Sequence, residues 1–136
     1  MSRDKRPLFV LGLGCQRSGT TWLHRYLNSL DQADLGPIKE YRIWDAKFTR
    51  AGKIFRPSLR NFLRRPKKEW LRWNMVRRPG FYERFFEGRV GGGVRLTGDI
   101  TPYYALLSAD DLERIRRRLE QRGFRVVAVY FMRDPI

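Results

Sequence analysis

Apolar residues form two uninterrupted runs, at residues 8–13 and 126–132, near the two ends of the chain. Runs without polar alternation are typical of strands buried on both faces of a parallel sheet. Residues 94–100 alternate apolar and polar side chains, which predicts a third, short strand. Because long stretches with helical periodicity separate these strands, the pattern predicts an α/β fold with a central parallel sheet.

Two helices are expected between the strands. A glycine-bounded turn at residues 14–19 precedes apolar residues that recur every three or four positions, which predicts a helix with one buried face. His24 falls outside that face and is expected to be an ordinary helix-surface histidine. The residues of the expected buried face are Trp22, Leu23, Tyr26, Leu27 and Leu30.

The second helix is marked by a cap at each end. Ser108, followed three residues later by Asp111, predicts a helix N-cap, and Gly123 predicts the C-terminal stop. The expected buried face comprises Leu112, Ile115 and Leu119.

The stretch between the first helix and the third strand has a weaker pattern. Residues 36–40 are interpreted as a short strand that completes a strand–helix–strand unit. Residues 41–93 are aromatic and basic, and prolines predict short helices joined by loops, one of them over residues 79–86. The interrupting prolines are Pro57, Pro66 and Pro79.

The chain length of 136 residues suits one domain, with three zones at residues 1–40, 41–93 and 94–136. A parallel strand at residues 126–132 should be followed by a crossover helix. The sequence therefore predicts the N-terminal part of a larger, three-layer fold that is incomplete at its C-terminus. The alternative is a small domain whose last strand lies at an edge.

Charge is unevenly distributed. The chain has 29 Lys and Arg against 14 Asp and Glu, and residues 50–89 hold 13 cations and 3 acids. This excess favours a polyanionic partner, such as nucleic acid, a sulfated or phosphorylated ligand or an acidic membrane surface. A solvated surface without a function is the alternative.

Several classes are disfavoured by composition. Cys15 is the single cysteine and His24 the single histidine, which excludes an internal disulfide framework and a multi-cysteine zinc site. No apolar run approaches the ~20 residues of a membrane helix, and no signal-peptide pattern is present. We therefore expect a cytoplasmic protein without a transmembrane segment.

Residues 14–21 read G-C-Q-R-S-G-T-T, close to the phosphate-binding pattern G-x-x-x-x-G-K-[ST]. Thr20 stands where the pattern has lysine, and Arg17 supplies a cation three residues earlier. Glycines let backbone N–H groups curve around a phosphate, and the following helix presents its positive end. Loss of the lysine disfavours a nucleoside triphosphatase or kinase, which stays open as an alternative, as does a basic polyanion-binding module.

Residues 9–23 resemble the 5′-phosphosulfate loop of the sulfotransferases that use 3′-phosphoadenosine 5′-phosphosulfate (PAPS), with R-S-G-T-T-W-L as the fingerprint. Residues 98–104 resemble the G-[DE]-x-[ST]-P-x-Y segment of carbohydrate-type and bacterial members. Residues 127–135 resemble the strand and R-D-P start of the 3′-phosphate site. The resemblance implies a P-loop-like fold and sulfuryl transfer from PAPS without a metal.

The resemblance also implies roles for individual residues. Arg133 would contact the 3′-phosphate, and Arg17 would also neutralise the leaving group. The family's serine after R-D-P and its adenine loop have no counterpart here, so we expect weak PAPS binding or none. The residues implied to hold the 5′-phosphosulfate are Arg17, Ser18, Gly19, Thr20 and Thr21.

Glu40 is the candidate general base. It follows Lys39 and precedes Trp44 and Asp45, and heparan-type sulfotransferases have a similar K-E followed by an aromatic residue and Asp, where the Glu is the base. A surface ion pair of Glu40 is the alternative. Asp99 could orient the acceptor or a loop cation, and a structural hydrogen bond is the equal alternative.

The acceptor is expected to be a hydroxyl or amine of a carbohydrate or other small molecule, with an anionic acceptor as one alternative, and nucleic acid is disfavoured. In the family the middle zone builds the acceptor cleft. The sequence does not determine the acceptor, the choice between O- and N-sulfation, or the oligomeric state.

Overall fold

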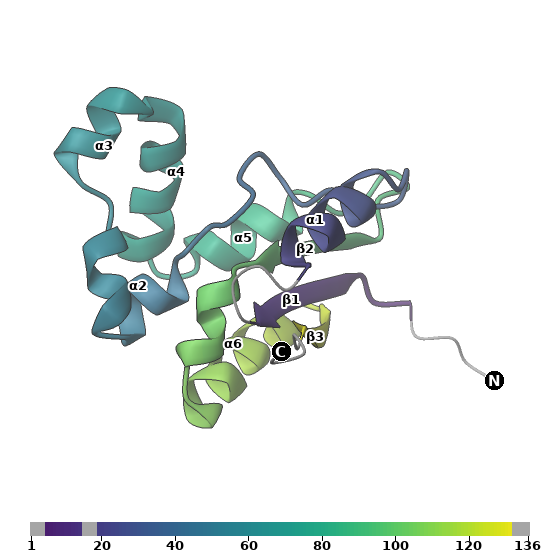
Figure 1. Cartoon of the computed structure of the whole chain (residues 1–136). Coiled ribbons are helices and arrows are strands. Elements are labelled where there is room, and N and C mark those ends of the chain that lie inside the picture. The colour runs from purple at the N-terminus through teal and green to yellow at the C-terminus, as the bar shows by residue number, and fades with distance from the viewer. Residues whose placement is uncertain (1–4, 15–18, 132–136) are drawn as a thin grey trace.

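Three parallel strands form the centre of the protein: β1 (Leu8–Gly14), β2 (Leu96–Ile100) and β3 (Arg125–Phe131). The structure, a computed structural model, describes residues 5–14 and 19–131. The strand order is β2-β1-β3, so β1 is the middle strand (Figure 1). The predicted α/β class with a parallel sheet is confirmed, and all three predicted strands form.

The register places the carboxyl ends of the strands at one edge of the sheet. Gly12 of β1 pairs with Ile100 of β2 and with Val129 of β3. The backbone N–H of Thr101, the first residue after β2, donates to the carbonyl of Gly12 across 3.2 Å. The glycine-rich turn therefore leaves the sheet beside the segment that follows β2.

Helices cover both faces of the sheet. On one face α5 (Phe81–Glu87) and α6 (Ala109–Gln121) enclose the larger core, in which Phe9 packs edge-on against Phe86 with ring centroids 5.0 Å apart. On the other face α1 (Thr20–Asn28) contributes Leu27 to a smaller apolar cluster. Figure 1 shows α1 and α6 on opposite sides of β1.

The capping signals of α6 are confirmed. The hydroxyl of Ser108 accepts the backbone N–H of Asp111 across 3.1 Å. The helix ends at Gln121, and Gly123 takes a φ of 92°, a left-handed conformation that favours glycine. Ile115 and Leu119 are fully buried, as their helical spacing predicts.

The predicted packing of the first helix is wrong in part. Leu27 is buried, but Trp22 is 61% exposed and Tyr26 is 50% exposed, and their rings stack on each other 5.3 Å apart. The helix contacts the narrow three-stranded sheet along a stripe that is too small to cover all five apolar residues. Stacking then removes part of the two aromatic faces from water.

The predicted strand at residues 36–40 does not form. Gly36 takes a φ of 80° and Pro37 has no backbone N–H to donate, so the chain turns here and runs on as a loop. The hydroxyl of Tyr41 donates to the carbonyl of Leu35 across 2.7 Å and closes this loop. Glu40 consequently lies in a loop and not at a strand end.

The middle zone consists of short helices, as predicted. Pro66 begins a helix at its first turn, where the missing N–H costs nothing, and the helix predicted from Pro79 begins at Phe81. The elements are α2 (Trp44–Phe48), η1 (Ala51–Phe55), α3 (Leu59–Arg64), α4 (Pro66–Arg77) and α5, with η2 (Pro102–Leu106) following β2. The first two helices after η1, α3 and α4, form a hairpin that projects from the sheet (Figure 1).

Within the described residues, no helix combines the length and the apolar character that crossing a membrane requires.

Candidate functional site

The two glycines that flank the turn after β1 have the backbone conformation that the sequence pattern predicts for them. Gly14 has a φ of 146° and Gly19 a φ of 102°, values that side-chain-bearing residues rarely adopt. Gly19 is the N-cap of α1, and its carbonyl accepts the N–H of Leu23 across 3.0 Å. Both glycines of the phosphate-loop pattern therefore occupy positions that require glycine.

The residues implied to bind the 5′-phosphosulfate lie partly outside the described residues. Arg17, Ser18 and also Arg133 belong to the parts of the chain that the structure does not describe. Thr20 and Thr21 are the first two residues of α1, where backbone N–H groups have no acceptor within the helix. Thr20 is buried, whereas Thr21 is exposed.

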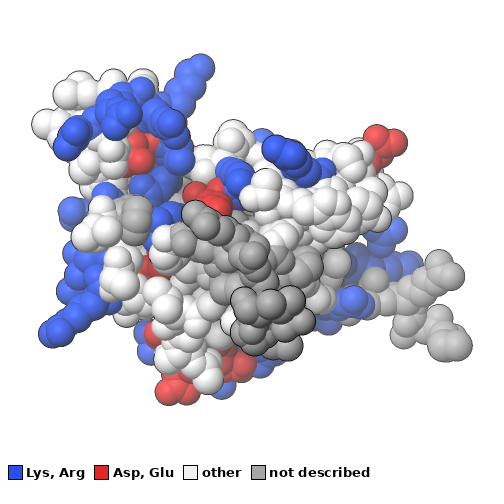
Figure 2. Space-filling model, in the orientation of Figure 1, with Lys and Arg blue, Asp and Glu red and all other residues white. Residues whose placement is uncertain are grey.

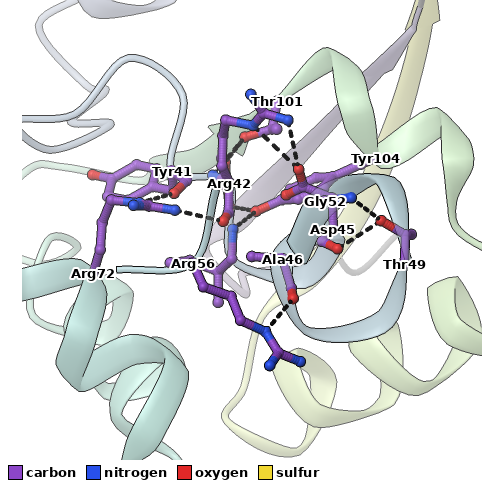
Figure 3. A network of polar contacts seen from close by, with 12 residues as sticks. Tyr41, Arg42, Asp45, Ala46, Thr49, Gly52, Arg56, Arg72, Thr101 and Tyr104 are labelled. Carbon is purple, nitrogen blue, oxygen red and sulfur yellow. Dashed lines mark hydrogen bonds and ion pairs between the residues drawn. The ribbon is translucent and has the colours of Figure 1, made fainter. Parts of the chain in front are cut away.

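Glu40 is half-buried, and the backbone that follows it is fixed from α4. Arg72, itself buried, donates from Nε to the carbonyl of Tyr41 across 2.8 Å and from Nη2 to the carbonyl of Arg42 across 3.0 Å (Figure 3). Its Nη1 donates to Glu69 across 3.1 Å. One guanidinium thus ties the loop of Glu40 to the middle zone.

The same loop is fixed from the sheet side. The backbone N–H of Arg42 donates to the hydroxyl of Thr101 across 3.3 Å. The backbone N–H of Ile43 donates to the hydroxyl of Tyr104 across 3.1 Å. Because Thr101 is also bonded to β1, these contacts place the segment after Glu40 at the carboxyl edge of the sheet, where ligands bind in open α/β folds.

Asp99 accepts hydrogen bonds from Thr101 and Tyr104, the two side chains that hold this loop from the sheet side. It is fully buried and accepts hydrogen bonds from the hydroxyls of Tyr82 (2.7 Å), Tyr104 (2.6 Å) and Thr101 (2.8 Å). Burial raises the pKa of Asp99 to about 6, although the three hydroxyl donors oppose the shift. Of the two roles considered for Asp99, the structure supports structural hydrogen bonding.

A second buried acid, Asp45, lies beside this network. Oδ2 of Asp45 accepts from Nε and Nη2 of Arg42 across 3.2 and 3.0 Å. Arg42 has a φ of 56°, unusual for a residue with a side chain, and its guanidinium lies 3.7 Å from the ring centroid of Tyr103. The ion pair and the ring contact together hold this strained turn.

Glu40 also lines a polar pocket of about 260 Å³ between its loop and the α3–α4 hairpin. Lys and Arg side chains gather on this hairpin (Figure 2). The spacing of Arg65, Lys68 and Arg72 places these cations on one side of a helix, but nothing in the sequence pattern connects them with Glu40. The cations of the pocket wall are Arg42, Arg64, Arg65, Lys68 and Arg72.

His24 differs from its predicted surface position. It is half-buried, and burial together with the charge of Lys39 lowers its pKa. Its Nε2 has no hydrogen-bond partner within the described part of the chain. Its closeness to Lys39 shows that the loop before Glu40 lies against α1. Cys15 lies outside the described residues.

Across residues 5–14 and 19–131, no three His, Cys, Asp or Glu side chains lie close enough together to form a metal site. Comparison with protein-family models, with curated proteins and with solved structures finds no match for this chain.

Proposed function

We propose that this protein is a sulfotransferase that moves the sulfuryl group of PAPS to a hydroxyl or amine of an acceptor. The observation that carries the proposal is the turn between the central strand β1 and α1. Its two motif glycines both adopt positive φ, and β1 ends at the edge of the sheet where the segment after Glu40 is anchored. Such a turn lets backbone N–H groups converge on an oxyanion.

The residues present fit the anionic tail of PAPS. Gly14 and Gly19 leave the turn free of Cβ atoms at its two ends, and the N-terminal N–H groups of α1 at Thr20 and Thr21 have no helical acceptor. These groups and Arg17 would hold the 5′-phosphosulfate, and Arg133 the 3′-phosphate. PAPS, when bound, supplies an activated sulfuryl group.

Glu40 would act on the acceptor. Its carboxylate accepts the proton of the acceptor hydroxyl or amine, which raises the nucleophilicity of that oxygen or nitrogen. Arg72, Thr101 and Tyr104 hold the backbone of the following residues and thereby limit the positions that Glu40 can take. Arg17 would stabilise the negative charge that develops on the leaving phosphate.

Calorimetric titration of the whole chain with the desulfonated product PAP, with ATP plus Mg²⁺ and with an oligonucleotide tests the proposal. We expect weak binding of PAP without Mg²⁺ and its loss in Arg17→Ala. Arg25→Ala is the matched control, because Arg25 is exposed on α1 and the charge change is the same. Preference for ATP with Mg²⁺ would support the kinase alternative, and salt-sensitive binding of the oligonucleotide alone would support the polyanion-binding module.

A further inference from the structure

The polar pocket beside Glu40 has two kinds of cation in its wall. Arg42 and Arg72 each pair with a buried acid, Asp45 at 3.0 Å and Glu69 at 3.1 Å. These two guanidinium groups are therefore compensated and serve to hold the loop of Glu40.

Three other cations of the wall are not compensated in this way. Arg64, Arg65 and Lys68 form no ion pair with an acid among the described residues. Arg64 ends α3, Arg65 is the N-cap of α4, and Lys68 lies in the first turn of α4. Cations near a helix N-terminus face its positive dipole, so Arg65 and Lys68 are electrostatically unfavourable there without an anion, whereas Arg64 lies at the C-terminal end of α3.

The pKa of the Lys68 side chain is affected by these neighbouring charges. It is half-buried, and its burial and the charges of Arg65 and Arg72 lower its pKa, against the opposing charges of Glu69 and Glu40. A charge held near like charges gains most when an anion enters. The geometry of the pocket and this crowding both indicate a site for a negatively charged group.

We propose that this pocket binds a carboxylate or sulfate group of the acceptor, held by Arg64, Arg65 and Lys68, next to Glu40. The inference rests on the proposed function, because it assigns the substrate class of that site. An acceptor anchored by its anionic group presents a neighbouring hydroxyl or amine to the Glu40 carboxylate. The preferred substrates are then acidic sugars or similar small acids.

The size and charge of the pocket favour a single anionic group over a polyanion. A volume of about 260 Å³ accommodates one small substituted ring. Glu40 and Glu69 also line the pocket and would repel a chain of closely spaced phosphates. Arginine donors, in contrast, match the two oxygens of one carboxylate or sulfate.

The test compares p-nitrophenyl β-D-glucuronide with p-nitrophenyl β-D-glucoside, which differ by the carboxylate. Each is titrated calorimetrically into the whole chain without PAP, at low and at physiological salt. We expect the glucuronide to bind about tenfold more tightly. Lys68→Gln and Arg65→Gln should reduce the ratio of affinities toward one. Arg77→Gln, which removes a charge from the same helix outside the pocket, should leave the ratio unchanged.

A second measurement follows Lys68 directly by NMR titration of its side-chain amine. Saturation with the glucuronide should raise the pKa of Lys68, and the glucoside should leave it unchanged. Equal affinity for the two glycosides, including binding too weak to detect for both, would overturn the proposal. So would a preference that both pocket variants retain.

The same samples titrated with PAP and with ATP plus Mg²⁺ separate this inference from the function on which it rests. Preference for ATP with Mg²⁺ over PAP, with the glucuronide preference intact, would refute the sulfotransferase assignment and leave the anion site standing. Binding of PAP without any preference for the glucuronide would refute the anion site alone. Circular dichroism of each variant confirms that the fold is retained.

Discussion

The hydroxyl of Tyr104 donates to Oδ2 of Asp99 across 2.6 Å, and both side chains are fully buried. The same hydroxyl accepts the backbone N–H of Ile43, a residue 61 positions earlier in the chain. The Tyr104 hydroxyl therefore links the buried carboxylate of Asp99 in the sheet to the loop that follows Glu40.

Removal of this hydroxyl should change the titration of Asp99. In the native protein the pKa of Asp99 is about 6, and the hydrogen bond from Tyr104 lowers it. Tyr104→Phe removes a donor that stabilises the carboxylate, so the pKa of Asp99 should rise above 6. Carbon-13 NMR of the Asp99 carboxyl group measures the midpoint. Tyr26→Phe, which removes an exposed hydroxyl on α1, should leave the midpoint unchanged.

The raised pKa of Asp99 also predicts a pH dependence of stability. Between pH 3.8, the ordinary pKa, and about 6 the folded protein binds more protons at Asp99 than the unfolded chain does. The free energy of unfolding contributed by Asp99 therefore falls as the pH rises through this window, by up to about 3 kcal/mol. Urea unfolding of wild type and of Asp99→Asn at pH 4 to 7 measures the difference. A difference that is constant across this range would contradict the prediction.

Arg72 should contribute strongly to stability. Arg72→Met leaves Glu69 buried without its ion-pair partner and two carbonyls without a donor. Breaking a buried pair in this way costs about 3–5 kcal/mol. Urea denaturation gives the change in the free energy of unfolding. Arg77→Met on the exposed end of α4 is the control, and the prediction fails if the two variants lose similar stability.

Glu40→Gln should abolish most of the transfer activity while binding is retained. The amide cannot accept the acceptor's proton, so the rate should fall about 10²-fold or more, with the affinity for PAP unchanged. Initial rates with PAPS and the glucuronide, together with PAP calorimetry, measure both quantities. Glu120→Gln on α6 is the matched control. Turnover like that of wild type would remove Glu40 from the mechanism.

The close approach of β1 and β2 should make Gly98 intolerant of a side chain. A Cβ at Gly98 would overlap the carbonyl oxygen of Val10, which is backbone and cannot move aside. Gly98→Ala should therefore lower the free energy of unfolding by about 1–3 kcal/mol. At Gly88 an added Cβ meets its nearest atom at 3.4 Å with an ordinary φ of −68°, so Gly88→Ala should be nearly neutral. Thermal unfolding of both variants checks the contrast.

Local sequence predicted the elements whose pattern is carried by neighbouring residues. The apolar runs of β1 and β3 and the capped helix α6 are encoded by neighbouring residues, through alternation, periodicity and the Ser108 cap. The positive φ of Gly14 and Gly19 could also be predicted from the sequence, because glycine is the residue that most readily adopts positive φ in a turn.

The candidate site depended on contacts between residues far apart in the chain. Residues 36–40 follow the first helix, where a strand–helix–strand unit would have its second strand, but they pair with no strand, and Gly36 turns the chain into a loop. Trp22 and Tyr26 follow the helical apolar spacing, yet the narrow sheet leaves both exposed.

The sequence by itself determined the three strands, the phosphate-loop pattern and the basic middle zone. Only the tertiary structure brought Glu40 together with the cations of α3 and α4 and assigned Asp99 to the anchoring network. The contacts that anchor the loop after Glu40 join residues 30 to 61 positions apart, such as Arg72 to Arg42 and Tyr104 to Ile43. Periodicity describes which face of one element is apolar, whereas the partner of a buried polar group is set by how separate elements pack.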